Sequence, residues 1–270
     1  MKESDFFKIK NEMRPPEEIE NENKLINLER QLSEYLNAQD VPTTGDCRIN
    51  PEAFEKIYGT EQIKRDEKYV KELEQKWAAE EGDKTTRYGE QFEALKTIIF
   101  HKFLGKDFIV LRSSLYDDIV NKVDNIILDK KTGNLVCALD EVATMTGERF
   151  ENKKSAILER NKGNNGGGRL KYGLFIKEGK LSLGSTKHFP IFYLAIKPNY
   201  LKEAIRKMQP SLNETTEYER KLFDYFISLI DYQIKEMQLN PSIRENIKRS
   251  IIDLGHYLEA AKEKIENKYN

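Results

Sequence analysis

The sequence predicts an α/β protein built on a mixed β-sheet flanked by helices. Between residues 85 and 200 the apolar patterns run in the order helix, three strands, helix, strand, which is typical of a mixed sheet with helices on its faces. On both sides of this segment the chain is highly charged, and its apolar residues recur at helical spacing. We therefore expect a helical N-terminal extension (1–84), an α/β core (85–210) and a C-terminal helical pair packed on the core (211–270).

The composition is that of a folded protein with almost no net charge. Its 270 residues include 45 Lys or Arg and 46 Asp or Glu, so the formal net charge is -1. Near neutrality excludes a uniformly cationic nucleic-acid coat but leaves a local basic patch open. Apolar runs stay below the ~18–20 residues that span a bilayer, and the first residues lack the apolar centre of a signal peptide. Because two cysteines cannot form a disulfide framework, we expect a cytoplasmic protein with no membrane partner.

Both charged flanks are predicted to be helical. The N-terminal flank should hold one helix that ends before Pro42 and a second stretch over residues 51–79 that Gly59 interrupts. The C-terminal flank should hold two amphipathic helices separated at Asn240-Pro241. Their apolar stripes are too thin to form a core alone, so they either cover the central domain or mediate a homodimer.

The core elements can be placed from their patterns. We expect helices over residues 87–104 and 148–161, and strands over 108–112, 123–128, 135–144, 170–176 and 189–196. The last strand is nearly all apolar, which indicates a central position in the sheet. Residues 164–168 are too rich in Asn and Gly for a regular element and should form a mobile loop.

Three acidic residues in this core are candidates for chemistry. Glu93 lies on the first core helix, Asp124 at the start of the second strand and Asp140 near the end of the third. A carboxylate inside an apolar strand is costly to bury unless it faces a cleft, a partner or a cation. Acids on neighbouring antiparallel strands can bind a hard divalent cation through oxygen. The alternatives are that Asp124 caps a turn, that Glu90 replaces Glu93, and that a one-residue slip exchanges the faces of Asp140 and its neighbour.

These acids lie in a pattern that resembles a known superfamily. The pattern consists of Gly89-x-x-Phe92-Glu93 on a helix, Val123-Asp124 opening a strand, and Ala138-Leu139-Asp140-Glu141-Val142 on the next strand. It resembles the PD-(D/E)XK restriction-endonuclease-like superfamily, and its spacing is especially similar to that of archaeal Holliday-junction resolvases. The resemblance runs from Arg87 to about Ile196 and covers neither helical flank.

The resemblance implies a metal-dependent endonuclease, a hydrolase that cleaves nucleic-acid phosphodiester bonds and has DNA as its expected substrate. It implies that Asp124 and Asp140 bind Mg²⁺, with Mn²⁺ as an alternative, and that Glu93 binds a metal or its water. The chain departs from the pattern at the superfamily's lysine, whose position is occupied by Val142. A valine can neither polarise the attacking water nor neutralise the charge that develops on the phosphate.

Three explanations for the missing lysine remain open. Lys153 or Lys154 on the following helix, or less favourably Lys171, supplies the ammonium from another position. A second metal ion replaces it. Otherwise nothing replaces it, and the domain is a catalytically inactive nucleic-acid-binding protein. A further alternative, of a different class, is a protein-interaction module whose long acidic helices bind a partner.

One segment departs from the overall charge balance. Residues 149–187 contain ten Lys or Arg and three Glu, a net charge of +7. Such a patch attracts phosphate backbones through counterion release, although a solvated hairpin in a lysine-rich protein would look the same. The candidate nucleic-acid-binding residues in this segment are Arg149, Arg160, Lys162, Arg169 and Lys171.

Overall fold

The centre of the protein is a four-stranded mixed sheet. The computed structural model describes residues 15–81, 83–142, 144–163 and 166–269. The sheet has the order β1-β2-β3-β6, in which β1, β2 and β3 are antiparallel neighbours and β6 runs parallel to β3. Its strands are β1 (Phe108–Arg112), β2 (Asn125–Asp129), β3 (Leu135–Val142) and β6 (Ile191–Ala195). The predicted mixed sheet is therefore confirmed.

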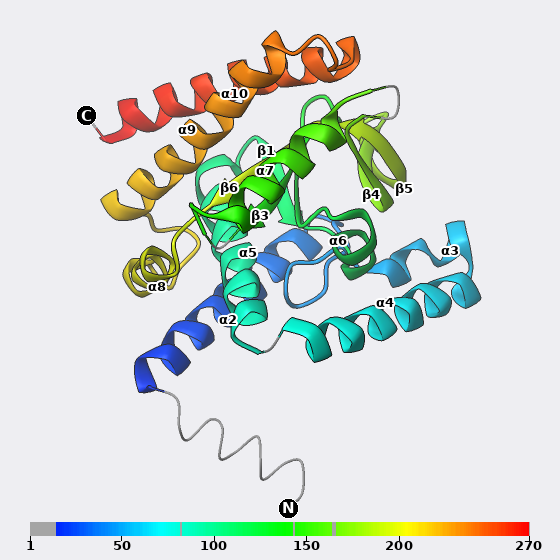
Figure 1. The fold of residues 1–270 in the computed structure, drawn as a ribbon, viewed down its shortest axis with the longest axis horizontal. Coiled ribbons are helices and arrows are strands. Elements are labelled where there is room, and N and C mark those ends of the chain that lie inside the picture. The colour runs from blue at the N-terminus through cyan, green and yellow to red at the C-terminus, as the bar shows by residue number, and fades with distance from the viewer. Residues whose placement is uncertain (1–14, 82, 143, 164–165, 270) are drawn as a thin grey trace, which may run out of the picture.

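Helices surround this sheet, and a separate hairpin is inserted before its last strand (Figure 1). The N-terminal helices are α2 (Pro16–Asn37), the 3-10 turn η1 (Pro51–Phe54), α3 (Glu55–Tyr58) and α4 (Thr60–Glu81). The core contains α5 (Asp83–Leu104), α6 (Leu115–Asn121), α7 (Glu148–Asn161), the hairpin β4 (Gly168–Lys177) and β5 (Lys180–Phe189), and α8 (Pro198–Lys207). The chain continues with α9 (Glu217–Leu239) and α10 (Glu245–Tyr269), which lie at the opposite end of the molecule from α4 (Figure 1).

Local sequence signals explain where several helices begin and end. Gly59, with a φ of 77°, ends α3 and separates it from α4, as predicted. Thr216 and Glu219 form a capping box at the start of α9, in which each side chain accepts a hydrogen bond from the other residue's backbone N–H. The helix α9 ends at Leu239, immediately before the predicted break at Asn240-Pro241.

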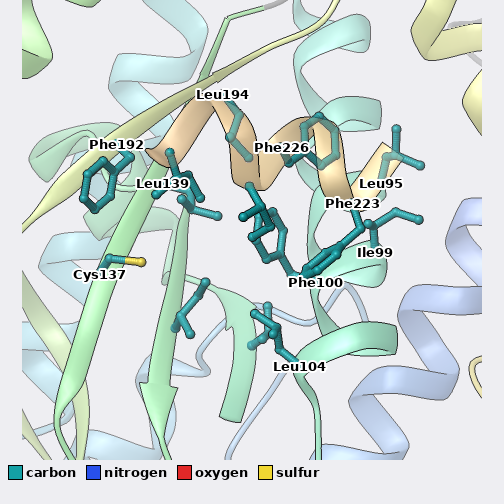
Figure 2. Packing of buried hydrophobic residues seen from close by; sticks show 14 of the residues in the cluster. Leu95, Ile99, Phe100, Leu104, Cys137, Leu139, Phe192, Leu194, Phe223 and Phe226 are labelled. Carbon is teal, nitrogen blue, oxygen red and sulfur yellow. The ribbon is translucent and has the colours of Figure 1, made fainter. Parts of the chain in front are cut away.

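Each face of the sheet is covered by a different set of elements. Figure 2 shows the larger cluster, in which Phe223 and Phe226 of α9 pack against α5 and against residues of β3 and β6. The rings of Phe100 and Phe226 stack with their centroids 6.1 Å apart. The opposite face packs against α7, the β4–β5 hairpin and residues of the N-terminal extension, including Leu32 and Phe54. The expected helical cover on both faces is thus present.

The last strand lies at an edge of the sheet, and the prediction of a central position is wrong. Amide side chains replace the missing neighbour: Asn161 of α7 pairs with both the N–H and the C=O of Ile191, at 3.0 and 2.8 Å. Gln233 of α9 pairs in the same way with Tyr193, at 2.9 Å for each bond. Two helices therefore cover this edge, which explains why an edge strand can be entirely apolar.

Other differences from the sequence-based expectations are limited. The strand β5 and the helices α6 and α8 were not expected. The predicted loop over residues 164–168 lies partly outside the described residues, and Gly168 already begins β4. None of the helices in the described ranges combines the length and the hydropathy of a membrane span.

Replacing Gln233 with methionine tests the edge contacts. The variant keeps the side-chain length but leaves the buried N–H and C=O of Tyr193 without their partner. We expect a loss of roughly 1–3 kcal/mol in the free energy of unfolding, measured by urea denaturation. The control is Gln238→Met on the exposed face of the same helix, which should change stability by less than about 0.5 kcal/mol. Equal effects of the two substitutions would show that the amide pairing contributes nothing.

Candidate functional site

Asp124 and Asp140 face each other across β2 and β3. The antiparallel register pairs Asn125 with Leu139, so one residue further along Asp124 lies opposite Asp140. Directly opposed residues have their Cβ atoms about 4.5–5.5 Å apart. The two carboxyl groups are within hydrogen-bonding reach of each other, and both residues are buried. The structure thus brings together the two acids that the sequence proposed as metal ligands.

Asp124 is held in its ionised form. Its Oδ2 atom lies 3.3 Å from Nζ of Lys96 and accepts a hydrogen bond of 2.9 Å from the backbone N–H of Glu141. Burial alone would raise the pKa of Asp124, but the Lys96 ammonium and these hydrogen bonds outweigh it and hold the pKa well below its usual range. These interactions favour the ionised form of Asp124.

Asp140 has the opposite character. Burial and the neighbouring charge of Asp124 raise its pKa to about 7, although Lys153 opposes the shift. Nζ of Lys153 lies 2.5 Å from Oδ1, and Nη1 of Arg160 lies 3.7 Å from Oδ2. Facing carboxylates whose environments favour different protonation states are typical of functional sites.

Of the two candidate lysines on α7, the structure brings one to the acids. Lys153 contacts Asp140 and lies close enough to Asp124 to interact with its charge. Burial lowers the pKa of Lys153, but the two carboxylates outweigh it and raise the pKa. Lys154 points elsewhere: its Nζ lies 3.8 Å from Glu236 and 5.6 Å from the ring centroid of Tyr232. Of the two lysines, Lys153 is therefore the one that lies against these acids.

Glu93 is engaged by two arginines. Nη2 of Arg48 lies 2.7 Å from Oε2 of Glu93, and Arg112 pairs with the same oxygen. These charges lower the pKa of Glu93 although burial opposes the shift. Nη1 of each arginine extends the network, to Asp118 at 2.8 Å from Arg48 and to Glu29 at 2.9 Å from Arg112. Glu93 thus lies near the facing acids, but its oxygen is already bound by protein cations.

The sequence reasoning missed Lys96, a central residue of the site. Lys96 is fully buried on α5 and pairs with both Asp124 and Glu141. Its signal was a lysine within the apolar run from Ala94 to Phe100, one helical turn after Glu93. The structure also settles the register: the side chain of Asp140 points toward α7, and that of Glu141 points toward α5, where Oε1 is close to Gly89.

Most of the candidate nucleic-acid-binding residues have partners within the chain. Arg160 donates to the backbone oxygens of Asn121 and Lys122 at the end of α6, at 2.6 and 2.7 Å. Arg169 donates to Oδ1 of Asn121 at 3.0 Å. These contacts place positive charge at a helix C-terminus, where it is favourable.

The remaining three differ in their surroundings. Lys171 pairs with Asp66 and lies 5.0–5.6 Å from the ring centroids of three tyrosines, Tyr58, Tyr116 and Tyr172. Lys162 pairs with Glu159 at 2.6 Å. The residue Arg149 is exposed on the first turn of α7. Of these three residues, Lys171 has a structural role, because its pairing with Asp66 of α4 fastens the β4–β5 hairpin to the N-terminal extension.

The donor chemistry of the facing acids fits a hard divalent ion in part. Two carboxylates that meet in a buried site repel each other, and a cation between them would relieve the repulsion that raises the pKa of Asp140. Carboxylate oxygens are the ligands that Mg²⁺ and Mn²⁺ prefer. The described part of the chain, however, contains no group of three or more His, Cys, Asp or Glu arranged to hold a metal ion. Asp124 and Asp140 would thus be the protein ligands, without Glu93.

The raised pKa of Asp140 predicts a pH-dependent stability. The folded protein keeps a proton on Asp140 up to about pH 7, whereas the unfolded chain loses it near 3.8. This contribution to stability is fully present below pH 3.8 and is lost as the pH rises through 7. Between pH 5 and 7, the unfolding free energy of the wild type should fall more steeply than that of Asp140→Asn, by about 1 kcal/mol per pH unit. Parallel slopes in urea denaturation would contradict it.

Comparison of this chain with known proteins identified no relative. No protein-family model matches the chain, and neither a curated protein nor a solved structure matches it.

Proposed function

We propose that this protein is a metal-dependent nuclease that hydrolyses nucleic-acid phosphodiester bonds. The observation that supports the proposal best is the meeting of Asp124 and Asp140 from adjacent strands, with Lys153 from the following helix against Asp140. Two opposed carboxylates can hold a divalent ion that activates water, and an ammonium can neutralise charge that develops on a phosphate.

The arrangement of elements supports the same proposal. Glu93 lies on a helix that precedes the sheet, Asp124 immediately before its second strand and Asp140 late in its third. These are the element types and the order that the resemblance to the restriction-endonuclease-like superfamily implies. The lysine departs from the motif by coming from α7 instead of β3, and this change explains how Val142 can occupy its position.

Each residue has a distinct role in the proposed site. Asp124, kept ionised by Lys96, and Asp140, once deprotonated, would be the oxygen ligands. When bound, the divalent ion would supply an activated water and stabilise charge on the phosphate. The Lys153 ammonium would lie beside the reacting phosphate and neutralise the negative charge that develops on its oxygens.

A second candidate function is supported by Glu93. Its carboxylate is bound by Arg48 and Arg112, so a third acidic group is withheld from any metal. A domain with this site would still bind nucleic acid without cleaving it. The two candidates predict different results in the same cleavage assay.

The cleavage assay should compare Lys153→Met with Lys154→Met. We expect the wild type to cleave at least one of single-stranded, duplex or branched DNA or RNA when Mg²⁺ or Mn²⁺ is present. Asp124→Asn and Asp140→Asn should lose on the order of 10²-fold or more in rate, and Lys153→Met about 10²–10³-fold. Lys154→Met is the matched control, because its ammonium pairs with Glu236 and not with the acids.

Two results would change the assignment. Undiminished cleavage by Asp140→Asn would show that the site formed by Asp124, Asp140 and Lys153 is not the active site. Binding that weakens with salt, combined with no cleavage under any divalent ion, would favour the inactive nucleic-acid-binding protein.

Metal binding itself predicts a thermal shift. At pH 8, saturating Mg²⁺ should raise the melting temperature of the wild type by about 2–6 °C, the shift expected from roughly 1–2 kcal/mol of ligand stabilisation. The shift should shrink at pH 6, because Asp140 must lose its proton to bind the ion and its pKa is about 7. The variant Asp140→Asn should show little shift at either pH. A shift of equal size in this variant would place the ion elsewhere.

A further inference from the structure

A tyrosine-lined pocket lies at the carboxyl end of β6. Its volume is about 400 Å³, within the range of small-molecule sites. We call it the tyrosine pocket, and its lining residues are Met145, Ile196, Lys197, Tyr200, Tyr218, Lys221, Leu222 and Tyr225. None of them belongs to the facing acids or to the basic segment that the sequence singled out.

The pocket is formed where three elements meet. Ile196 and Lys197 follow β6, and Lys197 is the N-cap residue of α8, whose first turn carries Tyr200. Tyr218, Leu222 and Tyr225 are spaced four and three residues apart and share one face of α9. The hydroxyl of Tyr225 donates to the backbone oxygen of Ala195 at 2.8 Å, which fixes that ring against the end of the strand.

The lining combines aromatic rings with positive charge. Tyr200 is 51 % exposed, so about half of this residue is accessible to a ligand. Among the eight lining residues the charged ones are Lys197 and Lys221, both positive. Lys221 lies 3.6 Å from Glu217, an exposed pair that contributes little and can be exchanged for another anion. The N-terminus of α8 adds partial positive charge at the same place. A ligand that fits these groups has a flat aromatic part and a negative charge.

The pocket lies along the same strands as the facing acids. The parallel register pairs Asp140 with Tyr193, and Ile196 follows three residues later. At about 3.3 Å per residue this places the pocket roughly 10 Å further along the sheet. That distance corresponds to about three stacked nucleotides at 3.4 Å each. The pocket lies on the side of the sheet that α9 covers, whereas the side chain of Asp140 points toward α7. One nucleic-acid strand that passes around the carboxyl ends of β3 and β6 could reach both places.

We propose that the tyrosine pocket binds an unpaired base of a single-stranded nucleic acid whose backbone continues to Asp124 and Asp140. The inference rests on the proposed nuclease function and names its substrate class. A base can stack on a tyrosine ring only when its faces are free, and in a duplex they are stacked on neighbouring bases. The ammonium groups of Lys197 and Lys221 bind the adjacent phosphates.

Binding without cleavage tests this proposal. The probe is a fluorescein-labelled oligothymidylate of about 12 nucleotides, within the usual site size, followed by anisotropy in EDTA at low salt. Tyr200→Ala should weaken binding about 5- to 100-fold, as expected for the loss of one stacked base. The matched control is Tyr69→Ala, a tyrosine of α4 with similar exposure that lies outside the pocket. The double variant Lys197→Ala/Lys221→Ala should bind more weakly and with a shallower salt dependence.

The outcomes separate this proposal from the nuclease function. Loss of binding in Tyr200→Ala, with binding retained in Tyr69→Ala, supports the pocket whether or not any divalent ion yields cleavage. If the wild type cleaves single strands and Tyr200→Ala binds and cleaves them equally well, the pocket proposal fails and the nuclease function stands. A duplex of the same length that competes as well as the single strand overturns the proposal. So does a wild type that binds no oligonucleotide.

Discussion

The need to neutralise buried carboxylates shapes the centre of this protein. Glu93, Asp124, Asp140 and Glu141 are removed from bulk water, and an unpaired buried charge would cost several kcal/mol. Each is accordingly met by a cation from another element. Lys96 comes from α5, Lys153 from α7, and two arginines come from the segment before η1 and from β1.

This constraint also explains why the N-terminal extension belongs to the site. Arg48 reaches Glu93 because its segment is hydrogen-bonded to β1: the N–H of Ile49 donates to the backbone oxygen of Arg112, and the N–H of Arg112 donates to Cys47. The extension therefore supplies a charge that the core lacks. Without it, Glu93 would retain a single arginine and would be a better ligand for an added cation.

The sequence predicted the strands and helices better than the partners of the site. Regular apolar patterns located the strand at residues 108–112 and the helix at 148–161 to the residue. The strand β5 was missed because Gly, Ser, Thr and Lys dominate it and it carries few apolar residues. Asp124 and Asp140 could be recognised from the sequence because a carboxylate within an apolar segment is costly to bury. By contrast, Arg48 and Glu93 are 45 positions apart, and a single sequence holds no signal that such residues meet.

The amide contacts of Asn161 and Gln233 have a consequence for assembly. These side chains pair with the backbone N–H and C=O groups of Ile191 and Tyr193 on the outer edge of β6. An incoming strand therefore cannot form hydrogen bonds with these groups. The segment at Arg48 bridges to Arg112 on the border at the other side. Continuing the sheet into a second molecule at the β6 border would therefore first require the side chains of Asn161 and Gln233 to be displaced.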